Sequence, residues 1–161
     1  MVGNALLQDR SSVWYGAIVK ADCNNIKIGA VSNIQEKCVL QTVSELETGF
    51  ASVLEVGRFT SIGPGSIITS STIGNGVTIG SGCIIGEGSV IEDYAIVSPG
   101  SVVPAGTFIK SGEFWAGNPA IKQREVSADE KASVEKKAEA TAALASKHSA
   151  EFLPHGFAYA E

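Results

Sequence analysis

Histidine and cysteine are the side chains of this sequence best suited to bind a metal ion or attack a substrate, and there are few of them. The two histidines, His148 and His155, lie near the C-terminus. The three cysteines, Cys23, Cys38 and Cys83, are odd in number, far apart and without a CxxC spacing. This pattern favours neither a disulfide framework nor a thiolate zinc site. We expect the cysteines to be small buried residues and the histidines to have packing or surface roles.

The composition and charge disfavour several classes of function. The chain has 161 residues, of which 44% are hydrophobic and 18% charged, as in a folded domain with a substantial core. A net charge of −5 and dispersed lysines and arginines disfavour a nucleic-acid surface. The sequence contains no uninterrupted apolar run of about 18 residues, so no transmembrane segment is predicted. The first residues, MVGNALLQDR, have the features of neither a secretory signal nor a transit segment, so any import signal is expected to have been removed.

Aliphatic residues recur every six positions along most of the chain. The runs are Leu7, Val13 and Val19, then Ile28, Ile34 and Leu40, then Val56, Ile62 and Ile68, and finally Ile73, Ile79, Ile85, Ile91, Val97, Val103 and Ile109, ending at Trp115. A helix needs apolar spacings of three and four, and such frequent glycines would weaken it. The six-residue period instead predicts a β-helix, in which each coil of about 18 residues has three faces and every aliphatic side chain points inward.

The repeats divide the chain into two regions. Residues 1–121 are predicted to form a mainly β, left-handed parallel β-helix, and residues 122–161 a C-terminal helix with an extended tail. The long gap between Leu40 and Val56 predicts an inserted external loop at about residues 42–55. The step from Ile68 to Ile73 is one residue short.

The C-terminal region has the signals of a single helix. Ser127 and Glu130 form a capping box, which predicts a helix from about residue 128 to about residue 150, and Pro154 follows as a stop. A weakly apolar stripe runs along it, formed by Val134, Ala138, Thr141, Ala142, Ala145 and His148. These small side chains predict packing along the β-helix or against a neighbouring subunit. Phe157 and Tyr159 in the tail are candidates for contact with a partner.

Five segments together resemble the γ-class carbonic anhydrases, specifically the carbonic-anhydrase-like subunits of mitochondrial respiratory complex I. They are SSVWYGAIVKAD at 11–22, NIQEKCVLQT at 33–42, GRFTSIGPGSIITSSTIG at 57–74, SGEFWAGNPA at 111–120 and LASKHSAE at 144–151. Hexapeptide repeats alone are shared with many acyltransferases and identify only the fold. The combination of these blocks is more specific, and it covers nearly the whole chain.

The resemblance implies where a zinc site would lie. Enzymes of that family hold zinc at each interface of a trimer with three histidines, two from one subunit and one from its neighbour, and the metal generates a hydroxide that attacks CO₂. In this sequence the three histidine positions match Gln41, Pro64 and Thr69. Proline has no free donor, and glutamine and threonine are weak neutral ligands. The resemblance therefore implies a site that has kept its outline and lost its metal.

Three further positions of the family's site are partly kept. An arginine and an aspartate of the enzymes match Lys20 and Asp22, so the aspartate survives while the arginine has become lysine and lost its bidentate fork. Gln35 also survives. Because acid–base helpers without a metal have nothing to activate, we expect a structural role for these residues, such as a salt bridge between subunits.

The resemblance implies a catalytically inactive structural subunit. It would form a heterotrimer with two related chains and bind membrane-arm subunits of complex I, peripherally, on the matrix side of the mitochondrial inner membrane. This chain would hold no cofactor, and zinc could bind only at the interface between the other two subunits. Long flat faces of a β-helix usually bury their apolar area against a partner, and Trp14, Tyr15 and Phe50 are candidates for that contact. Core packing is the alternative, particularly for Trp14.

Three other functions are open on the sequence. A hexapeptide acyltransferase would need a general base, and no histidine lies on the predicted coils. A metal-free binding trimer would hold bicarbonate or another small molecule through Asp22, Gln35, Gln41 and Thr69. An active anhydrase with unusual ligands is the least favoured reading.

Overall fold

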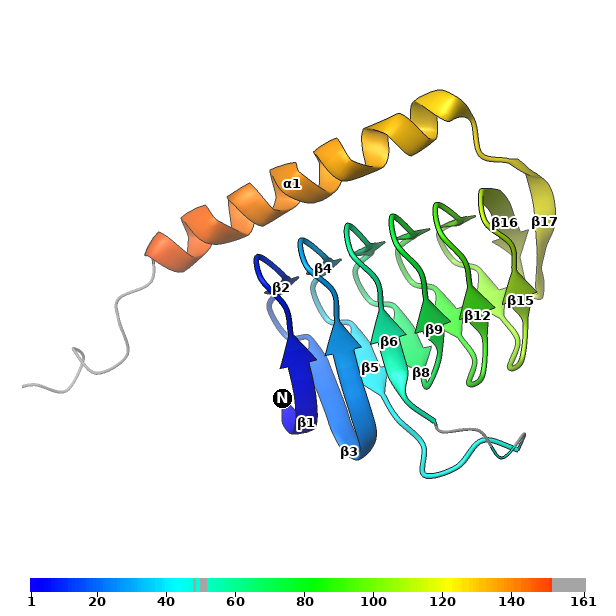
Figure 1. The fold of residues 1–161 in the computed structure, drawn as a ribbon, viewed down its shortest axis with the longest axis horizontal. Coiled ribbons are helices and arrows are strands. Elements are labelled where there is room, and N and C mark those ends of the chain that lie inside the picture. The colour runs from blue at the N-terminus through cyan, green and yellow to red at the C-terminus, as the bar shows by residue number, and fades with distance from the viewer. Residues whose placement is uncertain (48, 50–51, 152–161) are drawn as a thin grey trace, which may run out of the picture.

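Short parallel strands wind into a β-solenoid of about six turns, followed by one helix, in the computed structural model, which describes residues 1–47, 49 and 52–151 (Figure 1). Successive strand segments fall on three faces in turn, and within these residues the last turn has no strand on face 3. Face 1 contains β1 (Val2–Leu7), the C-terminal part of β3 (Ile18–Ile28), β6 (Leu54–Val56), β9 (Thr72–Ile73), β12 (Val90–Ile91) and β15 (Phe108–Ile109). Face 2 contains β2 (Ser12–Val13), β4 (Asn33–Ile34), β7 (Ser61–Ile62), β10 (Thr78–Ile79), β13 (Ile96–Val97) and β16 (Glu113–Gly117). Face 3 contains the N-terminal part of β3, β5 (Val39–Gln41), β8 (Ile67–Thr69), β11 (Ile84–Ile85) and β14 (Val102–Val103).

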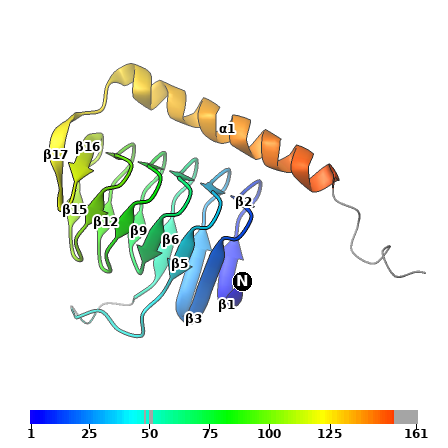
Figure 2. The ribbon, with the colours of Figure 1, turned by 180° about the vertical axis from the view of Figure 1, so that it is seen from behind.

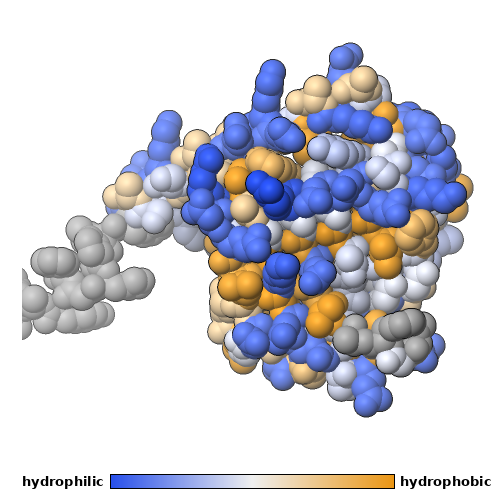
Figure 3. Space-filling view, in the orientation of Figure 1, coloured by the Kyte–Doolittle hydropathy of each residue, from blue (hydrophilic) through white to orange (hydrophobic). Residues whose placement is uncertain are grey.

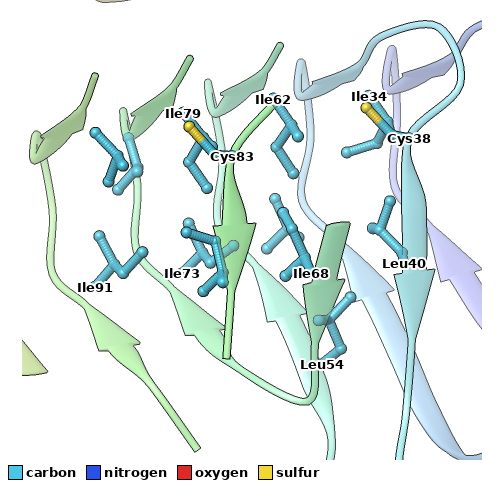
Figure 4. Packing of buried hydrophobic residues seen from close by; sticks show 14 of the residues in the cluster. Ile34, Cys38, Leu40, Leu54, Ile62, Ile68, Ile73, Ile79, Cys83 and Ile91 are labelled. Carbon is cyan, nitrogen blue, oxygen red and sulfur yellow. The ribbon is translucent and has the colours of Figure 1, made fainter. Parts of the chain in front are cut away.

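The hexad residues form the core, as predicted. Equivalent residues of successive turns are register partners, as Ile73 and Ile91 are on face 1 and Ile85 and Val103 on face 3. Figure 4 shows hexad side chains such as Ile73 and Ile91 inside the solenoid, where Ile34, Ile62 and Ile68 are fully buried. Burial of one such side chain contributes about 1.5–3 kcal/mol, so the column of residues supplies the main stabilising free energy. The parallel solenoid is observed, whereas its left-handed sense and its trimeric state stay predictions.

Hydroxyl groups satisfy backbone carbonyls at the corners between faces. Ser66 Oγ donates to the carbonyl of Gly80 at 2.9 Å, and Ser89 Oγ donates to that of Pro104 at 3.0 Å. Glycine is required where one turn lies directly on the next: a Cβ on Gly57 would come within 2.4 Å of the carbonyl oxygen of Gly74. These hydroxyls therefore pair buried carbonyls where the corners are tight.

Two places in the solenoid differ from the prediction: the inserted loop and the step from Val19 to Ile28. The inserted loop ends at residue 53 rather than at about 55, because Leu54 is fully buried and already pairs with Ile26. The nine-residue step from Val19 to Ile28 was not predicted to be special. It is bridged by the 11-residue strand β3, which pairs with β5 at one end and with β6 at the other.

A β-hairpin closes the C-terminal end of the solenoid. Strand β16 pairs antiparallel with β17 (Ala120–Glu125), so the predicted division at residue 121 falls inside β17. The buried Glu113 accepts hydrogen bonds from Trp115 Nε1 at 2.9 Å and from Lys122 Nζ at 2.9 Å. Lys122 also pairs with Glu125.

Helix α1 (Ala128–Glu151) lies along the corner between faces 1 and 2, with its N-terminus near the β16–β17 hairpin and its C-terminal end near the first turn (Figures 1 and 2). The capping box is confirmed: the N–H of Glu130 donates to Ser127 Oγ at 3.3 Å, and the N–H of Ser127 donates to Glu130 Oε2 at 2.8 Å. Val134, Ala138 and Ala142 are buried, so the predicted stripe faces the solenoid. No helix in residues 1–47, 49 and 52–151 is long and apolar enough to span a bilayer.

The helix rests on side chains that project from this corner. Val31 and Phe59 have positive φ values of 58° and 54°, which are costly for such side chains, and both pack against Ala138 and Ala142. Asn33, fully buried on face 2, donates from Nδ2 to the carbonyl of Ala138 at 3.1 Å. The predictions on Phe50, Pro154, His155, Phe157 and Tyr159 lie outside the described residues.

Candidate functional site

Three residues predicted for the altered metal site form a row at one margin of face 3. Lys20 and Gln41 are register partners in β3 and β5, and Gln41 and Thr69 are register partners in β5 and β8. Gln41 Nε2 donates to Thr69 Oγ1 at 3.1 Å. The structure therefore brings two of the three ligand positions into direct contact.

The sequence builds this row because the preceding residues are core residues. Leu40 and Ile68 are fully buried, and side chains alternate along a strand, so Gln41 and Thr69 point outward. Both strands end here. The inserted loop follows Gln41, and the short corner follows Thr69, where Ser70 has a φ of 32°.

Hydrogen bonds fix the base of the inserted loop beside the row. Ser70 Oγ accepts from the N–H of Val43 at 2.9 Å and donates to the carbonyl of Ser52 at 2.8 Å. Asn24 Nδ2 donates to the carbonyl of Val43 at 2.9 Å and also contacts Ser52 Oγ. These residues were not predicted from the sequence. The signal available was the cluster of Asn, Thr and Ser at both ends of the insertion.

Lys20 and Asp22 lie close but form only a weak pair. Their charged atoms are 4.0 Å apart, and the side chains are 48% and 46% exposed. A pair this exposed contributes little to stability in water. Both groups are therefore available to a surface that approaches the margin of face 3.

Pro64 and Gln35 lie at the opposite margin of face 3. Pro64 is exposed in the turn that precedes β8, whereas Thr69 is the last residue of that strand. Its carbonyl accepts from the N–H of Gly82 at 2.9 Å. The N–H of Gln35 donates to the carbonyl of Ile62 at 3.0 Å, in the same corner of the solenoid. The six predicted site residues thus form two separate groups.

The donors present do not fit zinc. Zinc sites in proteins use imidazole, thiolate or carboxylate groups. Gln41 and Thr69 offer an amide and a hydroxyl that already bond to each other, and Pro64 offers no side-chain donor. No group of three or more His, Cys, Asp or Glu side chains suited to a metal ion occurs among the described residues.

The cysteines lie away from the row. Cys38 and Cys83 are buried, and their thiols donate to the carbonyls of Gly63 at 3.2 Å and Ser98 at 3.1 Å. Burial raises the pKa of both thiols, which disfavours the reactive thiolate. The expectation that all three cysteines are buried is wrong for Cys23, which is exposed in the part of β3 that turns the corner.

His148 has a packing role, as predicted. Its ring lies 5.5 Å from that of Trp14 and 6.2 Å from that of Tyr15, with 3.4 Å between its Nδ1 and the Tyr15 hydroxyl. A cavity of about 300 Å³ adjoins these rings. Trp14 and Tyr15, proposed as partner contacts, are thus engaged with α1 within the chain.

An aliphatic row runs along the outside of face 3. The five residues stand one per turn and in register: Ile18, Val39, Ile67, Ile84 and Val102. Ile18, Ile67 and Ile84 are 50%, 37% and 45% exposed. Each of these residues directly precedes an inward hexad residue in the sequence, and this position is the signal from which the row could have been predicted.

Comparisons with known proteins agree with this architecture. Residues 70–105 match the family model described as bacterial transferase hexapeptide (six repeats). The chain is 47% identical over its full length to two Arabidopsis thaliana proteins, gamma carbonic anhydrase-like 1 and 2, mitochondrial. It spans 64% and 63% of their lengths, less than two thirds. A solved structure of a hexapeptide transferase family protein from Anaplasma phagocytophilum has a TM-score of 0.79 and 30% identity, with 91% of this chain and 82% of that chain covered.

Proposed function

This chain belongs to the hexapeptide-repeat family, with mitochondrial gamma carbonic anhydrase-like proteins as close homologues, and on that basis we propose that it is a catalytically inactive structural subunit of respiratory complex I. In this proposal it forms a heterotrimer with two related chains. The trimer docks on the membrane arm of complex I, peripherally, at the matrix side of the mitochondrial inner membrane.

The observation that supports inactivity is the contact between Gln41 and Thr69. Two positions that would hold the metal in an enzyme of this family bond instead to each other, at 3.1 Å. Neither group can lower the pKa of a water molecule as zinc does, so no hydroxide is generated at neutral pH. Lys20, Asp22 and Gln35 then serve assembly rather than catalysis, and zinc is confined to the interface between the other two chains.

The decisive experiment is gentle extraction of the native assembly, followed by its composition and activity. We expect co-migration with complex I together with two related chains. We also expect that CO₂ hydration by the assembly is unchanged when Gln41 is replaced by Ala. A free homotrimer would overturn the complex I assignment, and a hydration rate that depends on Gln41 would overturn the inactivity.

A second candidate is a metal-free trimer that binds bicarbonate or a similar small anion. The exposed Lys20 ammonium beside the Gln41 amide is the observation that favours it, because both groups donate hydrogen bonds to oxyanions. Titration with ¹³C-bicarbonate, compared between the natural chain and Lys20→Met, tests it. Saturable binding that Lys20→Met weakens would support this candidate, and no binding at physiological concentrations would remove it.

A hexapeptide acyltransferase has less support. The solved structure described above shares the solenoid, but residues 1–125 of this chain contain no histidine to act as a general base. Acetyl transfer from acetyl coenzyme A to a panel of amine and hydroxyl acceptors would test this function directly.

A further inference from the structure

The C-terminal part of α1 and the first turn of the solenoid enclose a hollow that none of the functions above uses. It has two adjoining parts, of about 300 and 710 Å³, which share Ser12, Val13, Ala145 and Ser149 as lining residues. Volumes of this size are typical of small-molecule sites. Figure 3 shows hydrophilic side chains between hydrophobic ones on the side of the solenoid drawn in Figure 1, whereas this hollow gathers aromatic rings in one part and charged groups in the other.

Three aromatic rings line the smaller part of the hollow. Trp14 and Tyr15 follow β2 in the first turn, and His148 lies near the end of α1. The ring centroids are 5.5 to 6.4 Å apart, and each pair of ring planes is inclined by 64° to 78°. Rings inclined so steeply to one another cannot all stack on one flat ligand. They suit a compact, rounded cation, which is attracted to the π-systems of several rings at once.

The electrostatic surroundings of this part also favour a cation. The C-terminal end of a helix carries a partial negative charge, and α1 ends at the exposed Glu151. The described residues that line this part include no lysine or arginine to repel a cation. The net charge of the whole chain, −5, acts in the same direction. A quaternary ammonium group is the cation that fits best, because it needs no hydrogen-bond acceptor and its methyl groups pack on aromatic rings.

The larger part of the hollow holds an arginine in an unusual position. Arg10 has a positive φ of 54° at the corner place that Val31 and Phe59 occupy in the next two turns. Those two side chains pack against α1, whereas Arg10 is exposed. Its guanidinium forms no ion pair or hydrogen bond with any residue in the described part of the chain. The backbone strain therefore places an unengaged positive charge at the mouth of the hollow.

This arginine is suited to a phosphate group. A guanidinium binds phosphate through two parallel hydrogen bonds, and the hydroxyls of Ser146 and Ser149 on α1 are further donors in the same part. Asp9 lines this part as well. Its carboxylate opposes a bare anion but is compatible with a ligand that carries both charges. The two parts together favour a zwitterion with a quaternary ammonium at one end and a phosphate at the other.

We propose that the hollow between α1 and the first turn binds a phosphocholine group. The quaternary ammonium lies among the rings of Trp14, Tyr15 and His148, and the phosphate pairs with Arg10. A two-carbon bridge joins the charged groups of this ligand, so a single molecule reaches from one part of the hollow into the adjoining one. The same group occurs in soluble choline esters and in the headgroup of phosphatidylcholine. The proposal uses no residue of face 3 and does not depend on the proposed function.

The two tryptophans allow a direct test by NMR. Trp14 lines the hollow, whereas Trp115 is bonded to Glu113 at the opposite end of the solenoid and serves as an internal control. Titration of the ¹⁵N-labelled chain with phosphocholine is expected to shift the indole N–H signal of Trp14 saturably and to leave that of Trp115 in place. Trp14→Phe assigns the signals. An unchanged Trp14 signal, or equal shifts of both signals, would overturn the proposal.

Variants test the two ends of the ligand separately. Tyr15 is 50% exposed, so Tyr15→Leu removes a ring without opening the core. It should weaken the binding of choline and of phosphocholine at least about threefold, because both ligands carry the quaternary ammonium. Arg10→Gln should weaken phosphocholine binding at least about fivefold and leave choline binding unchanged. Arg58→Gln, which removes an arginine outside the hollow, is the matched control. Equal affinities of the natural chain and both hollow variants would refute the site.

Vesicles distinguish the source of the phosphocholine group. Co-sedimentation with phosphatidylcholine vesicles that Tyr15→Leu weakens would support the proposal with a lipid headgroup as the ligand. Binding of free phosphocholine without binding to these vesicles would support it with a soluble ester. Vesicles of phosphatidylglycerol, which carry a phosphate but no ammonium, are the control. Equal binding to both kinds of vesicle, without saturable binding of free phosphocholine, would show that the ammonium is not recognised and would overturn the proposal.

Discussion

At the scale of single residues, Gln41 and Thr69 occupy two positions at which the family resemblance implies zinc ligands, and the fold places these two positions side by side. The two side chains leave adjacent parallel strands in the same direction and meet at 3.1 Å. Imidazoles at the same positions would be close enough to share one metal ion. If the chain binds no zinc, as proposed above, the cause lies in the residue types at these positions and not in the backbone geometry.

This argument predicts that Gln41→His combined with Thr69→His creates a zinc site. Two neutral imidazoles on neighbouring strands should bind Zn²⁺ at least about tenfold more tightly than the natural pair, because they replace weak oxygen donors. Isothermal titration with ZnCl₂ measures the affinity, and Gln41→His alone is the control. Equal affinity of the double variant and the natural chain would contradict the geometry described for face 3.

Ser71 supplies a second prediction at this scale. Its hydroxyl is buried and has no hydrogen-bond partner in the described part of the chain, beside the corner that is one residue short. Ser71→Ala is expected to raise the free energy of unfolding by about 1 kcal/mol, since it removes a desolvated polar group. Urea denaturation measures this change.

Ser66 is the matched control for Ser71. It is equally buried, but its Oγ donates to the carbonyl of Gly80 and accepts from the N–H of Cys83 at 3.2 Å. Ser66→Ala should therefore lower the free energy of unfolding by about 1–2 kcal/mol. The same sign of change in both variants would refute the difference in hydrogen bonding on which the prediction depends.

At the scale of elements, the N-terminus of α1 is held by a charged hydrogen-bond cluster. The two guanidinium nitrogens of Arg124 donate to Glu130 at 2.7 and 2.8 Å, and the N–H of Ser127 adds a third bond. Hydrogen bonding from Arg124, followed by that from Ser127, lowers the pKa of Glu130 from 4.5 to about 2. The cluster therefore links strand β17 to the helix only while this carboxylate is ionised.

The lowered pKa predicts how pH acts on the element. Because the folded-state pKa lies below the unfolded value, the stabilisation is present above pH 4.5 and is lost as the pH falls toward 2. Glu130→Gln keeps an acceptor for the Ser127 N–H without the charge. The melting temperature of the natural chain should exceed that of the variant at pH 7, and the gap should narrow below pH 4.5. A constant gap would contradict the assignment.

The elements also show what a sequence can predict. The inward hexad residues, the capping box and the apolar stripe of α1 follow from local periodicity, and all three were predicted correctly. Strand β3 was not, because its course depends on pairing with β5 and β6, which follow it in the chain. The aliphatic row of face 3 was missed for a related reason. Each member is an ordinary residue beside a core residue, and the row exists only after the turns stack.

Local sequence patterns could not predict the contact between Trp14 and His148 either. The two residues are separated by most of the chain, and only the course of α1 along the solenoid brings their rings within 5.5 Å. Of the candidate site, the residue types at Gln41, Pro64 and Thr69 could be found by resemblance. Their division between the two margins of face 3 required the fold.

At the scale of the whole molecule, the separation of Gln41 and Thr69 from Pro64, at opposite margins of face 3, limits how many zinc ions a ring of three chains can hold. If each interface joins one chain's Gln41 and Thr69 margin to the neighbour's Pro64 margin, a chain lacking ligands at both margins disables both of its interfaces. We therefore predict at most one zinc ion per heterotrimer that contains this chain, as counted by native mass spectrometry.

The matched control carries Gln41→His, Pro64→His and Thr69→His in this chain alone. If both neighbours keep their own histidines, the control should bind up to three zinc ions, because the substitutions complete both interfaces. Two or more zinc ions in the natural assembly would contradict the prediction. An unchanged count in the control would show that the two margins of face 3 do not meet their neighbours in this way.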